Sequence, residues 1–153
     1  MAKRVILLAA TFCAVLAGVG ISCFGVWWYF SDWAPRAEFA RLLSGDSHVE
    51  ITSICFEGQG KKIQLTDESS LRYLSSALRS AAKDQHTLGT SYYAHVELST
   101  GGSVLCAVDI PEDDELITIG YPVDAMESMA DYLVRLPKPV PEKLNDLLSE
   151  LRN

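Results

Sequence analysis

The hydrophobic and polar positions divide the chain into one long apolar segment and a following part in which the two kinds alternate. No charged residue occurs at the 26 positions from Val5 to Phe30. A helix of this length reaches about 39 Å, and the hydrocarbon core of a bilayer is about 30 Å thick. The pattern predicts one N-terminal transmembrane helix that contacts the lipid bilayer through residues 5–30.

The residues that flank this segment indicate its orientation. Lys3 and Arg4 precede it, and five aromatic residues, among them all three tryptophans, fall within positions 27–33. Cations favour the cytoplasmic end of a span, and amphipathic rings favour the membrane–water interface. We therefore expect a retained signal-anchor over residues 1–30, with the N-terminus in the cytoplasm and the C-terminal part outside it.

Two other fates of this leader remain open. Gly18-Val19-Gly20 has the small-x-small form of a signal peptidase site, which would make residues 1–20 a cleaved signal peptide. Cys23 would be the attachment point of a lipid in a lipoprotein. The segment Gly20-Ile21-Ser22 before Cys23, however, lacks the large aliphatic residue that a bacterial lipobox has three places upstream.

Small residues recur at every fourth position of the apolar segment, at Ala10, Ala14, Gly18 and Ser22. This spacing places them on one helix face, where a second helix can approach closely. The face predicts an accessory subunit that assembles through its transmembrane helix. The alternative is chance, because the segment is rich in Ala and Gly.

The residues after the span predict a short helix and then a hairpin. Pro35–Leu43 has a proline suited to a first turn and apolar residues on one face, so residues 31–47 form a juxtamembrane helix and linker. Residues 48–153 form the extracytoplasmic domain. Its first strand is Val49–Glu57, in which Val49, Ile51 and Cys55 face one way and Ile54 and Phe56 the other. The turn signal Gly58-Gln59-Gly60 joins it to a strand over Lys61–Thr66.

A central helix follows, capped by Thr66 or Asp67, and its apolar stripe of Leu71, Leu74, Leu78 and Ala81 is expected to lie on the sheet. Lys83–Thr90 is predicted as a polar loop. Further strands are predicted over Tyr92–Leu98, Val104–Ile110 and Leu116–Tyr121, the first two with strict alternation.

The C-terminal third is less uniform in its pattern. For Asp124–Leu136 we expect a helical turn and then a short strand over Tyr132–Leu136, which Pro137 ends. Pro141 opens a last helix with a stripe of leucines. Strands interrupted by one helix, without a βαβ series, predict an α+β fold with a mainly antiparallel sheet of about five or six strands, packed by one central and one C-terminal helix.

The charge balance excludes two classes of partner. The chain has 13 Lys and Arg against 20 Asp and Glu, a net charge of −7. Nucleic-acid binding requires clustered cations that neutralise phosphates, and docking on anionic lipid requires a polybasic surface. We therefore expect no nucleic-acid partner.

The four cysteines predict at most one disulfide. Cys13 and Cys23 lie in the apolar span. Cys55 and Cys106 lie on predicted strands, each on the face expected to be core, and would pair if those strands lie close together outside the cytoplasm. The alternative is two buried thiols. No CxxC motif supports redox chemistry or a zinc site.

No motif frames a catalytic, cofactor or metal site. His48, His86 and His95 have no HExxH context. A small hydrolase would need His95 to converge with Asp109 or Glu97, and the alternative is an ordinary histidine on the sheet surface. The acidic run over residues 112–115 would suit a hard cation, but it lacks the spacing of an EF-hand, and a solvated loop is the usual explanation of such a run.

Three tyrosines, Tyr92, Tyr93 and Tyr121, are candidates for a contact surface, because tyrosine is enriched at protein interfaces. Packing within the sheet is the alternative for each of them. The sequence as a whole predicts a membrane-anchored, non-catalytic domain that binds a protein partner.

Overall fold

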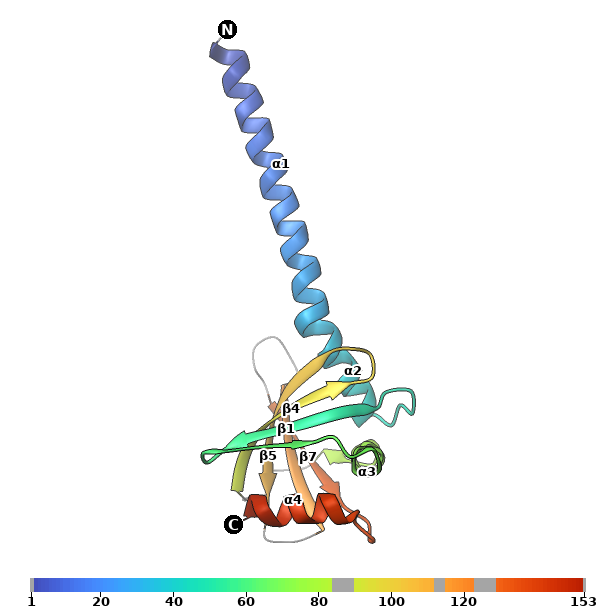
Figure 1. Ribbon diagram of the computed structural model, residues 1–153. Coiled ribbons are helices and arrows are strands. Elements are labelled where there is room, and N and C mark those ends of the chain that lie inside the picture. Colours follow the sequence, from blue (N-terminus) through green and yellow to red (C-terminus); the bar gives the residue numbers. More distant parts are fainter. Residues whose placement is uncertain (1, 84–89, 112–114, 123–128, 153) are drawn as a thin grey trace.

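The structure is a computed structural model that describes residues 2–83, 90–111, 115–122 and 129–152. It confirms the α+β class, with a long N-terminal helix that leads into a sheet domain (Figure 1). The elements of the described residues are, in chain order, α1 (Ala2–Trp28), the π-helical turn η1 (Tyr29–Trp33), α2 (Ala34–Leu43), β1 (Ile51–Gly58), β2 (Lys61–Leu65), α3 (Glu68–Arg79), β3 (Ala82–Lys83), β4 (Thr90–Leu98), β5 (Ser103–Ile110), β6 (Leu116–Pro122), β7 (Met129–Arg135) and α4 (Glu142–Arg152).

The seven strands form one sheet in the order β2-β1-β4-β5-β6-β7-β3, and every neighbouring pair is antiparallel. The helices α2, α3 and α4 meet the same face of this sheet. Phe39 from α2, Leu74 from α3 and Leu148 from α4 line a common apolar core with Ile54 and Cys106. The other face of the sheet carries no helix among the described residues.

The β1–β2 hairpin forms as predicted, at a turn that the sequence marks clearly. Gln59 and Gly60 have φ angles of 52° and 75°, and Gly58 pairs with Lys61. Two successive positive φ values define a type I′ turn, whose twist matches that of the flanking strands.

The helices that pack on the sheet also form where the patterns predict them. The side chain of Asp67 caps α3 by accepting a hydrogen bond from the Ser70 amide at 3.1 Å. The apolar stripes of α3 and α4 are buried against the sheet, at Leu71, Leu74, Leu78, Leu144, Leu147, Leu148 and Leu151.

The helix α2 is part of the domain core as well as the continuation of α1. Phe39 and Leu42 are fully buried, and Gly45, at a φ of 97°, follows the helix end. The segment expected to be a linker therefore contributes to the same hydrophobic cluster as the sheet.

The sheet differs from the prediction in its number of strands and at its C-terminal end. It has seven strands, because the two residues of β3 pair with β7 where a helix end and a polar loop were expected. The predicted short strand over Tyr132–Leu136 forms, but it starts earlier, at Met129, and lies inside the sheet between β6 and β3. The helical turn expected before it falls largely on residues 123–128, outside the described residues.

The alternation predicted for the first strand is wrong because of a β-bulge. Ile51 pairs with Leu98, but Ser53 already pairs with Glu97, so Thr52 is an extra residue in β1. A bulge of one residue exchanges the faces of all residues after it. Ile51 and Ile54 consequently share the core face, and Cys55 is turned to the other side.

Candidate functional site

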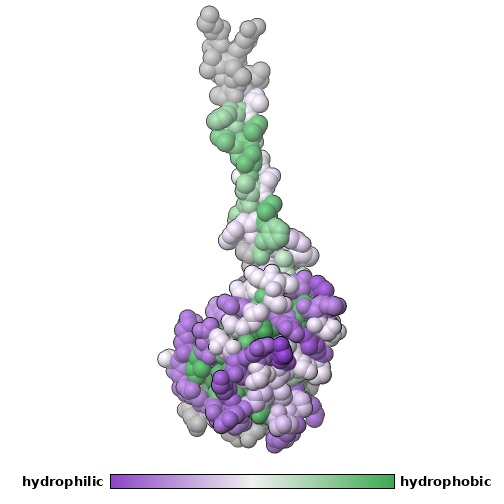
Figure 2. Space-filling view, turned by 45° about the vertical axis from the view of Figure 1, so that its right-hand side comes forward, coloured by the Kyte–Doolittle hydropathy of each residue, from purple (hydrophilic) through white to green (hydrophobic). Residues whose placement is uncertain are grey.

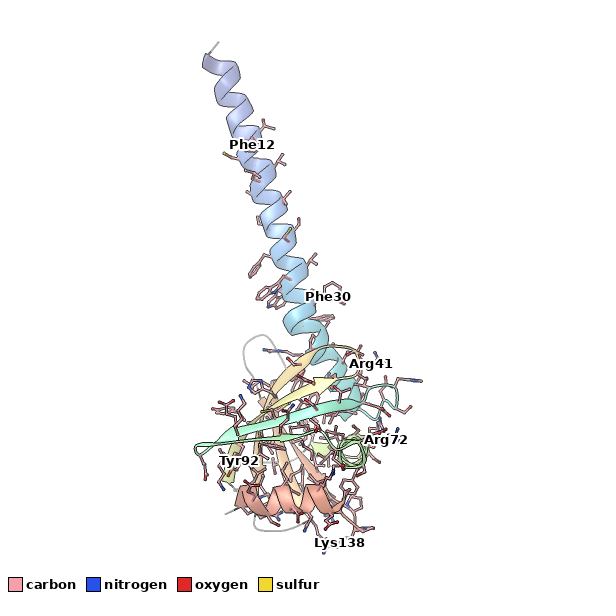
Figure 3. All side chains as sticks on the ribbon, in the orientation of Figure 1. Phe12, Phe30, Arg41, Arg72, Tyr92 and Lys138 are labelled. Carbon is pink, nitrogen blue, oxygen red and sulfur yellow. The ribbon has the colours of Figure 1, made fainter. Side chains whose placement is uncertain are left out.

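The helix α1 stands away from the domain as an apolar rod. Every side chain from Thr11 to Phe30 is exposed, and Figure 3 shows Phe12 and Phe30 projecting into open space. Among the described residues, α1 is the one helix long and apolar enough to cross a membrane. In Figure 2 the coloured part of the rod consists mainly of green and white residues, whereas purple, hydrophilic residues dominate the visible surface of the domain.

Aromatic rings surround the rod where it approaches the domain. Five large rings here are 43% or more exposed, those of Trp27, Trp28, Tyr29, Phe30 and Trp33. Tyr29 stacks on Trp33 with ring centroids 5.0 Å apart. This arrangement places the aromatic positions of the sequence in one zone between the apolar helix and the folded domain.

The small-residue face of α1 is open on the described part of the helix. The Ser22 hydroxyl donates to the Gly18 carbonyl at 2.9 Å, and a Cβ at Gly18 would meet no atom within 4 Å. Ala14 lies one turn before Gly18 and is also exposed. Ala10 lies in α1, but the described side chains begin at Thr11.

The junction between rod and domain is continuous helix with one π-turn. The Ala34 amide donates to the Tyr29 carbonyl, a bond that spans five residues. The next residue, Pro35, has no amide hydrogen, so it cannot continue the usual i→i−4 ladder, and a π-turn is one of the known accommodations of such a break.

The first turns of α2 are fastened to the sheet by close contacts. Pro35 lies against Gly102, where a Cβ would approach Pro35 Cγ to 2.5 Å. The Tyr121 hydroxyl donates to the Arg36 carbonyl at 2.5 Å, and the rings of Phe39 and Tyr121 lie 5.0 Å apart. These contacts join α2, which continues the rod, to the sheet.

The three candidate tyrosines do not form one surface. Tyr92 and Tyr121 are only 2% and 4% exposed, and the Tyr92 hydroxyl donates to the Leu151 carbonyl at 2.7 Å. Tyr93 is 62% exposed on the helix-free face of the sheet. The proposal of a shared surface is corrected to Tyr93 alone, because adjacent residues of a strand point to opposite faces.

Of the two alternatives for Cys55 and Cys106, the possible disulfide does not form, since both are free cysteines, and only Cys106 is fully buried. Cys55 lies opposite His95 on β4, and Cys106 lies opposite Ala94 on the same strand. The two thiols are thus on opposite faces of the sheet with β4 between them, which a disulfide cannot bridge. Burial raises the pKa of the Cys106 thiol to about 12.

His95 lies on the helix-free sheet face, and its cross-strand neighbours are Cys55 and Leu105. Glu97 is two residues further along the same strand, and its carboxylate accepts a hydrogen bond from Ser53 Oγ at 2.9 Å. Asp109 accepts one from Ser91 Oγ. Neither of the two hollows described below is lined by His95, so the geometry lends the hydrolase alternative no support.

The acidic run lies mostly outside the described residues. Glu115, its last member, pairs with Lys138 at 2.8 Å. Within the described ranges no group of three or more His, Cys, Asp or Glu side chains is placed to hold a metal ion.

The core holds a small apolar cavity of about 20 Å³ between the sheet and its helices. Its lining is entirely hydrophobic and includes Phe56, Val96 and Ile117. A volume of this size fits about one water, and an apolar lining offers a water no hydrogen-bond partner. The cavity is therefore a packing feature of the core.

The second hollow is an open groove of about 530 Å³ between the edge strand β2 and α4. Its lining is mixed in polarity and consists of Ile63, Gln64, Leu65, Thr66, Asp67, Glu68, Lys143, Asp146, Leu147 and Glu150. The sequence alone does not reveal this groove, since its two walls are about 80 residues apart in the chain. The periodicity of each wall was visible, but not their juxtaposition.

Comparison with protein-family models, curated proteins and solved structures gives no match to this chain.

Proposed function

We propose that the chain is a membrane-tethered binding protein. In this proposal α1 crosses the bilayer with its N-terminus in the cytoplasm, and the sheet domain lies outside the cytoplasm and binds a protein partner without catalysing a reaction. The observation that carries it is the contrast between α1, whose apolar side chains are exposed from Thr11 to Phe30, and the domain, whose apolar side chains are mostly buried. Water would destabilise such a rod, whereas lipid would accommodate it.

The junction supports the tether. The aromatic zone around Trp27–Trp33 suits the membrane interface, and the α2 contacts to Gly102 and Tyr121 hold the domain at that level. In this proposal, the contacts of α2 set the orientation of the domain relative to its span.

Two surfaces of the domain support binding. On the helix-free face, Tyr93 and Leu105 are 62% and 49% exposed on neighbouring strands. The groove between β2 and α4 is the second surface. Both combine apolar contact area with polar neighbours, as partner-binding surfaces do.

A second candidate is assembly through the span itself. It is favoured by the open face at Ala14, Gly18 and Ser22, where nothing would obstruct a neighbouring helix. Gly18→Leu should abolish co-purification of a membrane partner in this case, while leaving the domain folded. Unchanged co-purification would exclude this candidate.

Fractionation and cross-linking of the full-length protein test the main proposal. The protein should remain in membranes after alkaline carbonate and dissolve only in detergent. A photoactivatable residue in place of Tyr93 or Gln64 should give a specific adduct that a span-only control, residues 1–33, does not give. Recovery from the soluble fraction without detergent, or adducts no different from the control, would refute the proposal.

A further inference from the structure

The strand β2 leaves one edge of the sheet open. It is at one end of the strand order and pairs with β1. In its type I′ turn the Gly58 carbonyl accepts from the Lys61 amide, and hydrogen-bonded pairs then alternate along the hairpin. Lys61, Ile63 and Leu65 therefore bond to β1, and the N–H and C=O groups of Lys62 and Gln64 point away from the sheet.

This open edge forms one wall of the groove, and α4 forms the other. Ile63 and Leu65 from β2 and Leu147 from α4 contribute its apolar lining. Two lysine side chains also bridge the two sides of the groove, one from β2 to α4 and one from α4 to Asp67, the residue that caps α3. Lys61 Nζ donates to the Glu150 carbonyl at 2.8 Å, and Lys143 Nζ lies 3.0 Å from Asp67 Oδ1.

The groove carries an excess of negative charge. Four carboxylates line it, those of Asp67, Glu68, Asp146 and Glu150, against two cations, that of Lys143 in the lining and that of Lys61 at the Glu150 carbonyl. Asp67 is paired with Lys143, and Glu68 with Arg72 at 2.5 Å.

Unlike Asp67 and Glu68, the two carboxylates on α4 have no ion-pair partner among the described residues. They belong to Asp146 and Glu150, which are four residues apart on one helix, where like charges destabilise the helix. A cationic ligand in the groove would relieve this repulsion.

We propose that an extended, basic peptide segment of a protein partner binds in this groove by adding a strand to β2. Strand addition would satisfy the outward N–H and C=O groups of Lys62 and Gln64. Alternate side chains of the peptide would point towards α4. Lys or Arg at these positions would lay its aliphatic stem on Leu147 and its charged head beside Asp146 and Glu150. The inference rests on the proposed partner-binding function and assigns its site.

The position of the groove suits a partner away from the membrane. α4 lies at the end of the domain opposite to α1 (Figure 1). A segment bound along β2 and α4 is therefore clear of the aromatic zone and of the bilayer that we place there.

A second copy of this chain is a poorer occupant. Pairing of two β2 edges would bring the α4 helices of both copies to the same sheet face, and their unneutralised carboxylates would approach each other. The net charge of −7 on each copy adds to this repulsion.

The test uses the full-length protein in detergent micelles and a fluorescent six-residue peptide that alternates Thr and Lys, followed by fluorescence anisotropy. One control peptide alternates Thr with Glu, and a second carries N-methyl groups on every second amide.

The protein variants test the two walls of the groove. The double variant Asp146→Asn/Glu150→Gln removes the two carboxylate charges of α4. The variant Gln64→Pro removes one outward N–H of β2 without removing a hydrogen bond to β1. The variant Glu50→Gln/Glu97→Gln makes the same change in net charge away from the groove.

We expect saturable binding of the Thr-Lys peptide alone, about fivefold to tenfold weaker in the Asp146→Asn/Glu150→Gln variant and unchanged in the Glu50→Gln/Glu97→Gln control. Gln64→Pro and N-methylation should abolish binding. Circular dichroism checks that each variant folds.

Absence of binding, equal weakening by both charge variants, or a β2-dependent dimer would overturn the inference. In that case, cross-linked adducts at a photoactivatable residue in place of Tyr93 would still support partner binding, through the helix-free face of the domain. Failure of the groove proposal can thus be distinguished from failure of the proposed function.

Discussion

Pro35 and Gly102 pack so closely that no side chain fits at position 102. A Cβ there would lie 2.5 Å from Pro35 Cγ and 2.7 Å from Pro35 Cβ. This contact sets the distance between the base of the helical rod and the β4–β5 turn.

Gly102→Ala should therefore lower the free energy of unfolding by about 1–3 kcal/mol, the range for overpacked contacts. Urea denaturation in detergent micelles, followed by circular dichroism, measures this change. In a double-mutant cycle, adding Pro35→Gly to Gly102→Ala should recover part of the stability that Gly102→Ala loses. Strict additivity of the two changes would show that the contact does not limit packing.

The two adjacent tyrosines of β4 should respond differently to loss of the hydroxyl. Tyr92→Phe leaves the buried Leu151 carbonyl without its donor, and we expect a loss of about 1–3 kcal/mol of stability. Tyr93→Phe, on the exposed face, should stay within about 0.5 kcal/mol of the wild type. Thermal or urea denaturation compares the two, and equal effects would contradict the assigned faces.

The cysteines of the domain should differ in reactivity and should not pair. The Cys106 thiol, with its pKa raised to about 12 by burial, should stay unmodified by a maleimide at pH near 8, whereas the half-buried Cys55 reacts slowly. Both should react completely in urea. Mass spectrometry after oxidation should find no Cys55–Cys106 cross-link, and its appearance in folded protein would refute the β1 register.

The stability of the domain should fall in acid, partly through the α3 cap. Hydrogen bonds from Ser69, from Lys143 and from Ser70 hold the pKa of the Asp67 carboxyl well below its ordinary value of 3.8. A carboxyl whose pKa is lower in the folded state than in the unfolded state stabilises the fold. This stabilisation is complete at pH values above the unfolded-state pKa, and it is lost as the pH falls towards the folded-state pKa.

Asp67→Asn keeps a capping side chain but removes this titration. Thermal denaturation between pH about 6 and pH about 2 should therefore show a smaller loss of stability in the variant than in the wild type. An equal loss in both proteins would contradict this role of Asp67.

The sequence predicted the parts of the fold that depend on local pattern. The uncharged run indicated α1, the Gly58–Gly60 turn indicated the hairpin, and the leucine stripe after Pro141 indicated α4. The bulge at Thr52 could not be predicted, because Thr52 and Ser53 are small polar residues that fit either face. That one residue decides on which face Cys55 lies.

The candidate site was less predictable than the fold. The alternation of β4 already implied that Tyr92 and Tyr93 point to opposite faces, but not which of them is exposed. The groove depends on the meeting of β2 with α4, and nothing local to residues 61–65 or 142–152 indicates that contact. The end of the strand order, which makes β2 an edge, is likewise a property of the whole sheet.

The proposed function requires that α1 spans a membrane and that the domain lies on the far side from the N-terminus. Labelling of sealed, right-side-out membrane vesicles with a membrane-impermeant maleimide tests this requirement. The two variants are Asn145→Cys on the exposed side of α4 and Ala2→Cys at the start of α1, each combined with Cys55→Ser so that the reactive native thiol of the domain is not labelled. The Asn145→Cys protein should be labelled in intact vesicles, and the Ala2→Cys protein only after permeabilisation. Labelling at position 145 only after permeabilisation, or loss of the protein from the vesicles without detergent, would contradict this requirement.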